Sequence, residues 1–158
     1  MISKGTVLAV AALWAVACFN RAVAQIPEPS VDTTIQQTVD QLFNYFKTGQ
    51  GTRFRELYAP DISVYKDGAF IADPQAYLIG FSQGISQLHV HTLIWTRREV
   101  HVLADDAAVF AGEFKETISS SASSEPRDYQ VAWTALFRKI DGAWRIVHEH
   151  TSHVRPAR

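Results

Sequence analysis

The hydrophobic pattern of the chain changes once, from helical spacing in the first half to strand-like alternation in the second. Ile35, Val39 and Leu42 share one face of a helix expected over 31–48. Over 89–154 the pattern becomes that of strands separated by short turns. Helices followed by a run of strands are typical of an α+β fold. The sequence therefore predicts an α+β fold. If the sheet is strongly bent and carries the three helices on its concave face, it would enclose a pocket.

Each of the three expected helices has a residue suited to its start. Ser30 is a good N-cap for the first helix, because its side chain can accept a hydrogen bond from a free backbone N–H. Thr52 can cap a short second helix that Pro60 ends. Asp73 is followed by proline at the first helical position, which predicts a third helix reaching Gln87.

Strands fill most of the remaining chain. Asp67-Gly68 and Asp141-Gly142 are dipeptides that favour two-residue hairpin turns. The polar stretch 119–124 predicts a loop. The expected strands are 62–65, 69–71, 89–103, 108–118, 129–140 and 143–154.

The composition limits the class of protein. The chain has 158 residues, with 15 lysines and arginines, 16 acidic residues and 47% hydrophobic content. That length suits a single domain with a full hydrophobic core. A net charge near zero provides no extended positive surface. Nucleic acid and an acidic membrane surface are therefore not expected as partners.

Residues 1–24 are expected to be a secretory signal peptide. A positive start with Lys4 precedes an apolar run over 6–17, and Ala22-Val23-Ala24 offers small residues to a signal peptidase. The run is too short to span a bilayer, which takes about 20 residues. We expect one mature domain over 25–158, exported most simply to a bacterial periplasm.

The single cysteine, Cys18, lies inside that signal segment. Lipid attachment there is disfavoured, because Ala15 stands where a lipoprotein signal usually has leucine. Cleavage before Gln25 removes Cys18, so the mature domain would hold no disulfide and no thiolate nucleophile. Its fold would then depend on core packing alone.

The last two expected strands carry the clearest alternation. If Asp141-Gly142 forms a two-residue turn, Phe137 pairs with Ile146, and one face of the hairpin is largely apolar. Glu149 falls on the opposite, polar face. The residues expected to share the apolar face are Tyr129, Val131, Trp133, Ala135, Phe137, Trp144, Ile146, His148, His150 and Ser152.

Two histidines on that face are the candidate catalytic residues. His148 and His150 point the same way, about 6–7 Å apart. Burial beside tryptophans favours the neutral imidazole that a general base needs. Tyr65 is the candidate donor to a developing oxyanion. The alternative is that each histidine is a hydrogen-bonded core residue without a chemical role. The candidate substrate-binding residues are Trp133, Trp144, Phe137, Tyr129 and Tyr58.

A metal site is the remaining alternative for the histidines. His89 and His91 repeat the spacing of the later pair, and two such pairs could bind zinc or copper if their strands met. The chain has no Gly-rich phosphate loop, Gly-x-Ser-x-Gly elbow or His-Glu-x-x-His helix. No metal ligand is therefore assigned, and no cofactor is expected.

Two segments carry a resemblance to a known family. The order of elements, the stretch from Phe54 to Asp61 and the ending from Asp141 to Ser152 resemble the SnoaL-like branch of the nuclear-transport-factor-2-like, or ketosteroid-isomerase-like, superfamily. The resemblance covers 30–154. It implies a cone-shaped α+β barrel, in which three N-terminal helices pack on a strongly curved mixed sheet around a pocket. It also implies a homodimer formed through the sheet.

The resemblance implies several functions. The superfamily includes cofactor-free isomerases, cyclases, dehydratases, epoxide hydrolases and lyases, as well as non-catalytic binding and association domains, so the function must be argued from the site. Its enzymes typically use an aspartate in the pocket, a position at which this chain shows no clear aspartate. We therefore expect a pocket for a small, largely apolar organic ligand, with acid/base chemistry by His148 or His150. The alternatives are a non-catalytic dimeric binding or interaction domain and a histidine-based metal binder.

Overall fold

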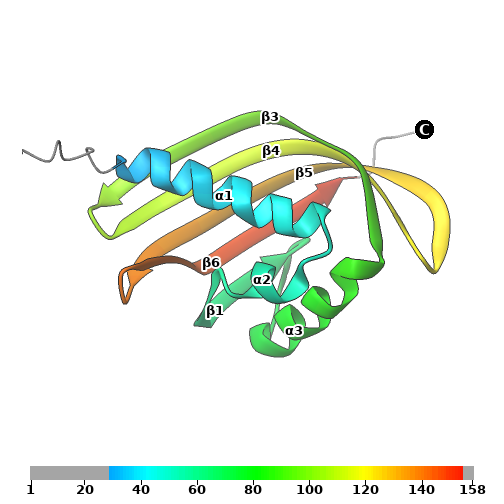
Figure 1. Ribbon diagram of the computed structural model, residues 1–158, viewed down its shortest axis with the longest axis horizontal. Helices are drawn as coiled ribbons and strands as arrows, with labels where there is room; N and C mark the ends of the chain where they lie inside the picture. Colours follow the sequence, from blue (N-terminus) through cyan, green and yellow to red (C-terminus); the bar gives the residue numbers. More distant parts are fainter. Residues whose placement is uncertain (1–28, 155–158) are drawn as a thin grey trace, which may run out of the picture.

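A strongly bent sheet of six strands forms the frame of the domain (Figure 1). The computed structural model describes residues 29–154, and the expected signal segment lies outside them. The strand order is β2-β1-β6-β5-β4-β3, with β1 parallel to β6 and the other pairs antiparallel. The sheet does not close, since β2 and β3 remain as edges. The strands are β1 Tyr58–Lys66, β2 Ala69–Phe70, β3 Leu88–Ala104, β4 Ala107–Ser120, β5 Ser123–Ile140 and β6 Ala143–Val154.

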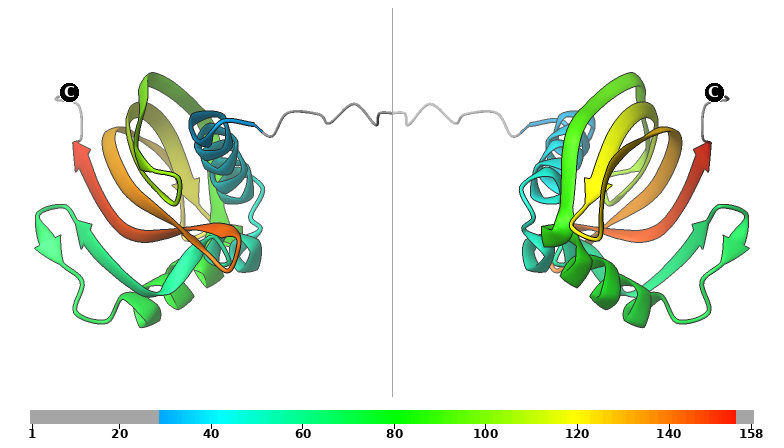
Figure 2. Two further views of the ribbon diagram at one scale, coloured as in Figure 1. Left: turned by 90° about the vertical axis from the view of Figure 1, so that its left-hand side faces the viewer. Right: turned by 90° about the vertical axis from the view of Figure 1, so that its right-hand side faces the viewer.

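The helices lie inside the curve of the sheet (Figure 2). The longest helix, α1, spans Val31–Lys47 and crosses β3 and β4, whereas α2 (Gly51–Arg55) and α3 (Pro74–Gly84) lie near β1. A 3₁₀ turn, Ile85–Gln87, continues α3. This arrangement confirms the α+β architecture, as an open cone.

Two expected helix starts are confirmed. The hydroxyl of Ser30 accepts a hydrogen bond from the backbone N–H of Thr33 at 3.2 Å. The carboxylate of Asp73 accepts one from the N–H of Ala76 at 2.9 Å, ahead of proline in the first turn of α3. Each cap accepts a hydrogen bond from a backbone N–H that has no partner within the helix. Such a cap stabilises the helix by about 1 kcal/mol.

The hydrophobic core lies between α1 and the concave face of the sheet. Ile35 and Val39 are completely buried, which confirms the helical spacing that predicted this face. Full burial of such a side chain stabilises the fold by about 1.5–3 kcal/mol. The core residues of the sheet that are completely buried include Val64, Phe110, Val131, Phe137 and Ile146.

The second helix is shorter than expected. It ends at Arg55, and Pro60 lies within β1 rather than at a helix end. The reason is tertiary, because Tyr58 already pairs with Ile146 of β6. Pro60 is tolerated there because the β1–β6 register shifts between Tyr58 and Ser63, so its missing N–H interrupts no regular ladder.

Both predicted two-residue turns are confirmed. Asp67 and Asp141 each have φ of 50°, and the glycine after each also has a positive φ, as a type I′ turn requires. The expected polar loop at 119–124 is wrong. Strand pairing continues to Ser120 and resumes at Ser123, so only a tight turn separates β4 from β5.

Candidate functional site

A β-bulge in β6 determines which of its side chains face the helices. Phe137 pairs with Ile146 as predicted, but Leu136 pairs with His148, so Val147 is an extra residue. Beyond it Ala135 pairs with Glu149. Because side chains alternate along a strand, one extra residue moves all the following side chains to the other face.

The expected placement of the two histidines is therefore wrong. His148 and His150 lie on the outer face of the sheet, and His150 is exposed. The hydroxyl of Ser63 lies 2.7 Å from Nδ1 of His148, and the ring of Tyr65 lies 5.9 Å from the same imidazole. The structure does bring the three candidate catalytic residues together, but outside the curve of the sheet.

The five candidate substrate-binding residues do not all line one cavity. Trp133 and Tyr58 line the cavity described below. Phe137 is completely buried in the core, and Trp144 is half-buried against that core beside the Asp141-Gly142 turn. Tyr129 is not part of this lining, and its ring packs edge-on against that of His153 with centroids 5.8 Å apart.

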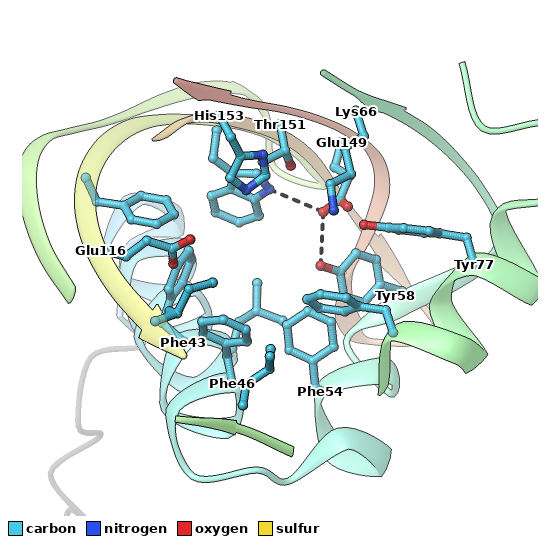
Figure 3. A pocket seen from close by; sticks show the side chains of 16 residues that line it. Phe43, Phe46, Phe54, Tyr58, Lys66, Tyr77, Glu116, Glu149, Thr151 and His153 are labelled. Atoms are coloured by element: carbon cyan, nitrogen blue, oxygen red, sulfur yellow. Dashed lines mark hydrogen bonds between the residues drawn. The ribbon is translucent and has the colours of Figure 1, made fainter. Parts of the chain in front are cut away.

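The cavity of about 160 Å³ lies between the helices and the inner face of β4, β5 and β6 (Figure 3). An apolar cavity of about 150 Å³ holds a benzene ring, so this one has about the volume of a site for a single ring. Its apolar and aromatic lining comprises Leu42, Phe43, Phe46, Phe54, Tyr58, Tyr77, Phe81, Leu88, Phe114, Ile118 and Trp133. Its other lining residues are Lys66, Glu116, Glu149, Thr151 and His153.

Glu149 is a buried polar group of this lining, with 6% of its surface exposed. Its Oε2 accepts a hydrogen bond from the hydroxyl of Tyr58 at 3.0 Å and another from the indole N–H of Trp133 at 3.2 Å (Figure 3). Burial raises the pKa of Glu149, and the two hydrogen bonds and Lys66 partly offset that rise. Burial and the nearby Glu149 raise the pKa of Tyr58, which therefore remains a donor.

Glu116 is a second buried carboxyl in the same cavity. Figure 3 shows it pointing into the cavity from the side opposite Glu149. Burial raises its pKa to about 7, although the charge of Lys66 acts in the other direction. Glu116 therefore exchanges its proton near neutral pH.

Lys66 brings a positive charge to the rim of the cavity. Its ammonium nitrogen lies 5.6 Å from the ring centre of Tyr77 and 5.8 Å from that of Phe81. At this distance a cation is attracted by the face of an aromatic ring. Burial, followed by the charge of Glu149, raises the pKa of Tyr77, so its phenol stays protonated.

Sequence reasoning missed Glu149, Glu116, Lys66, Thr151 and His153. For Glu116 a signal exists, because it alternates with Phe114 and Ile118 on one face of β4. For Glu149 the alternation pointed the wrong way, since a bulge has no reliable mark in a single sequence.

The two histidine pairs do not meet. His89 and His91 lie on β3, which β4 and β5 separate from β6. Neighbouring strands lie about 4.8 Å apart, so the pairs are separated by about 14 Å across the sheet. Within residues 29–154, no group of three or more His, Cys, Asp or Glu side chains is placed to hold a metal ion. In the same range no helix is long and apolar enough to cross a membrane.

The family model of the SnoaL-like domain matches residues 35–156. The chain belongs to the SnoaL-like domain family. The match confirms the resemblance found in the sequence, and it places the cavity of this SnoaL-like domain inside the matched region. A comparison with curated proteins gives no match.

Solved structures similar to this SnoaL-like domain support the same fold. A ketosteroid isomerase-like protein from Erwinia carotovora atroseptica is 15% identical, with a TM-score of 0.66 over 78% of this chain and 96% of that one. A nuclear-transport-factor-2-like protein from Rhodospirillum rubrum is 20% identical, with a TM-score of 0.64 over 76% and 98%. The association domain of C. elegans CaMKII is 19% identical, with a TM-score of 0.58 over 76% and 93%. At these identities the comparisons establish the fold, and the function must come from the cavity.

Proposed function

We propose that this SnoaL-like domain binds a small, largely apolar molecule with one ring and moves a proton on it without a cofactor. The reaction class is proton abstraction next to a carbonyl, or an elimination that begins the same way. The observation that carries this proposal is the carboxyl of Glu149, which is buried among aromatic rings and fixed through one oxygen.

The contacts of Glu149 suit a general base. Tyr58 and Trp133 both donate to Oε2, and Oε1 has no hydrogen-bond partner among the described residues. Oε1 is therefore the oxygen that can approach a C–H bond. Burial destabilises the carboxylate relative to the acid, which strengthens it as a base.

Two other groups complete the proposed chemistry. Glu116, with a pKa of about 7, can return a proton to a different position of the ligand. Lys66 supplies a positive charge for a developing oxyanion. Both act in a largely apolar cavity, where the interaction energy between charges is larger than in water.

The test is hydrogen–deuterium exchange into a panel of one-ring ketones in D₂O, with cyclohexanone as the smallest, followed by proton NMR. The wild-type protein should accelerate exchange beside the carbonyl. His148→Ala and His150→Ala should leave the rate unchanged, because both side chains lie on the outer face. Loss of exchange in either histidine variant would instead restore the histidine hypothesis. No acceleration across the panel would contradict proton abstraction.

A second candidate, a dimeric interaction domain, rests on exposed apolar side chains. Ile94 and Leu103 on β3 are 61% and 62% exposed. Such surface is typical of a protein contact when it is contiguous. Similarity to the fold of an association domain agrees with this candidate.

Native mass spectrometry of protein expressed with its full N-terminal segment would test export and dimerisation together. We expect a homodimer whose chains begin at Gln25, which would agree with signal cleavage and export to a periplasm. A co-purifying organic mass would favour the binding pocket. A monomer would contradict the dimer, and an intact Met1 after secretion-competent expression would contradict the signal peptide.

A further inference from the structure

Asp67 and His153 are joined at the edge of the cavity, where the β1–β2 turn meets the end of β6. One oxygen of Asp67, Oδ1, accepts a hydrogen bond from the backbone N–H of His153 at 2.7 Å and lies 2.9 Å from its Nδ1. The N–H of Asp67 in turn donates to the carbonyl of Thr151 at 2.8 Å. These two hydrogen bonds, both donated by backbone N–H groups, therefore hold Asp67 beside the imidazole.

This contact determines where the proton of a neutral imidazole resides. Although partial burial opposes it, hydrogen bonding from His153 lowers the pKa of Asp67, which is therefore an acceptor only. Nδ1 of His153 must then carry the hydrogen, because a carboxylate has no proton to donate. In neutral imidazole the other nitrogen, Nε2, is left as an acceptor.

The imidazole also belongs to the cavity. His153 lines it beside Thr151 and Glu149, since these three residues alternate on the inner face of β6 (Figure 3). The ring of Tyr129 packs edge-on against the imidazole at 82° and restrains its orientation. Among residues 29–154, Nε2 of His153 has no hydrogen-bond partner.

We propose that Asp67 and His153 form a recognition dyad, in which Asp67 holds the imidazole as its Nδ1–H tautomer and Nε2 accepts a hydrogen bond from a hydroxyl group of the ligand. Asp67 is the positioning residue and His153 the specificity-determining residue. This deepens the proposed function, on which it rests, by narrowing the ligand to a one-ring molecule with a hydroxyl group. The sequence predicted only a hairpin turn at Asp67 and no role for His153.

The tautomer can be measured without any ligand. Nitrogen-15 NMR of the imidazole at about pH 8, where histidine is mostly neutral, should show Nδ1 protonated and Nε2 unprotonated. Asp67→Gly should shift the ring toward the Nε2–H form, and Asp67→Asn should largely restore the wild-type pattern through its amide oxygen. Glycine suits this position because φ is 50° there. An Nε2–H tautomer in the wild type would overturn the dyad.

The second turn provides a matched control. Asp141 has the same φ of 50° and is also followed by glycine. Asp141→Gly should therefore leave the nitrogen shifts of His153 unchanged. A change as large as that in Asp67→Gly would show that the shifts report turn flexibility, which would overturn the positioning role of Asp67.

Ligand recognition is tested with phenol and fluorobenzene, which have similar shapes and differ in the hydroxyl donor. In the wild type phenol should bind more tightly than fluorobenzene. The ratio of the dissociation constant of fluorobenzene to that of phenol should fall by about three- to tenfold in His153→Phe, as expected for the loss of one buried hydrogen bond. An unchanged ratio would overturn recognition by Nε2. The two proposals can fail separately. If ketone exchange is absent but His153 is the Nδ1–H tautomer and phenol is preferred, the proposed catalysis is contradicted and the dyad is supported.

Discussion

Glu149→Gln is expected to lower the rate of ketone exchange by about 10²–10⁴-fold, the usual contribution of a general base. Glutamine cannot accept the proton, but its amide oxygen can still accept the hydrogen bonds that Tyr58 and Trp133 donate to Glu149. The fold should therefore persist, and proton NMR of the ketone in D₂O measures the rate directly. Exchange at the wild-type rate in this variant would exclude Glu149 as the base.

Two further variants separate chemistry from stability. Glu113→Gln, on the exposed face of β4, should retain full exchange. Glu149→Ala would leave the buried donors of Tyr58 and Trp133 unsatisfied. Each such group costs about 1–3 kcal/mol, so urea denaturation should show a free energy of unfolding lower by about 2–6 kcal/mol. Glu149→Gln as unstable as Glu149→Ala would make its loss of exchange uninformative.

Glu116→Gln is expected to make the protein more stable at alkaline pH. In the folded protein the pKa of Glu116 is raised from 4.5 to about 7. The folded state therefore holds this proton more tightly than the unfolded chain, and the resulting stabilisation, complete below about pH 4.5, is lost as the pH rises through about 7. At about pH 8 the variant lacks the buried charge and should be more stable by up to about 3 kcal/mol.

Urea denaturation at about pH 4.5 and about pH 8 measures this difference. The advantage of Glu116→Gln over the wild type should appear only at the higher pH. Glu113→Gln is the control, because its carboxyl lies on the exposed face of the same strand and should show no such pH-dependent gain. An equal advantage at both pH values would show that packing, rather than ionisation, distinguishes the two side chains.

Local chemistry made much of the fold predictable. Ser30 and Asp73 cap helices because their side chains satisfy free N–H groups nearby in sequence. The Asp141-Gly142 turn and the pairing of Phe137 with Ile146 likewise depend on a few adjacent residues. The resemblance supplied what such rules do not, the way in which the helices and the sheet enclose a cavity.

The candidate site was harder to predict because it depends on contacts between distant segments. Beyond Ile146 the strand pairs with β5 on one side and β1 on the other, and both registers shift there. His148 pairs with Ser63 of β1. The alternation within the last hairpin contains no information about this pairing with β1. Glu116 lies on an unshifted stretch of β4, and its burial between Phe114 and Ile118 was within reach of the pattern.

The extra residue at Val147 determines which reactive side chains of β6 face the cavity. Side chains alternate between the two faces of a strand, so the number of residues between the Asp141-Gly142 turn and the cavity decides which ones face inward. With the extra residue the carboxylate of Glu149 faces the cavity, and without it the imidazole of His148 would do so. Two relatives with nearly identical last strands could therefore carry opposite reactive groups if their lengths differed by one residue there. In this chain a single extra residue therefore decides which of two neighbouring reactive groups lines the cavity.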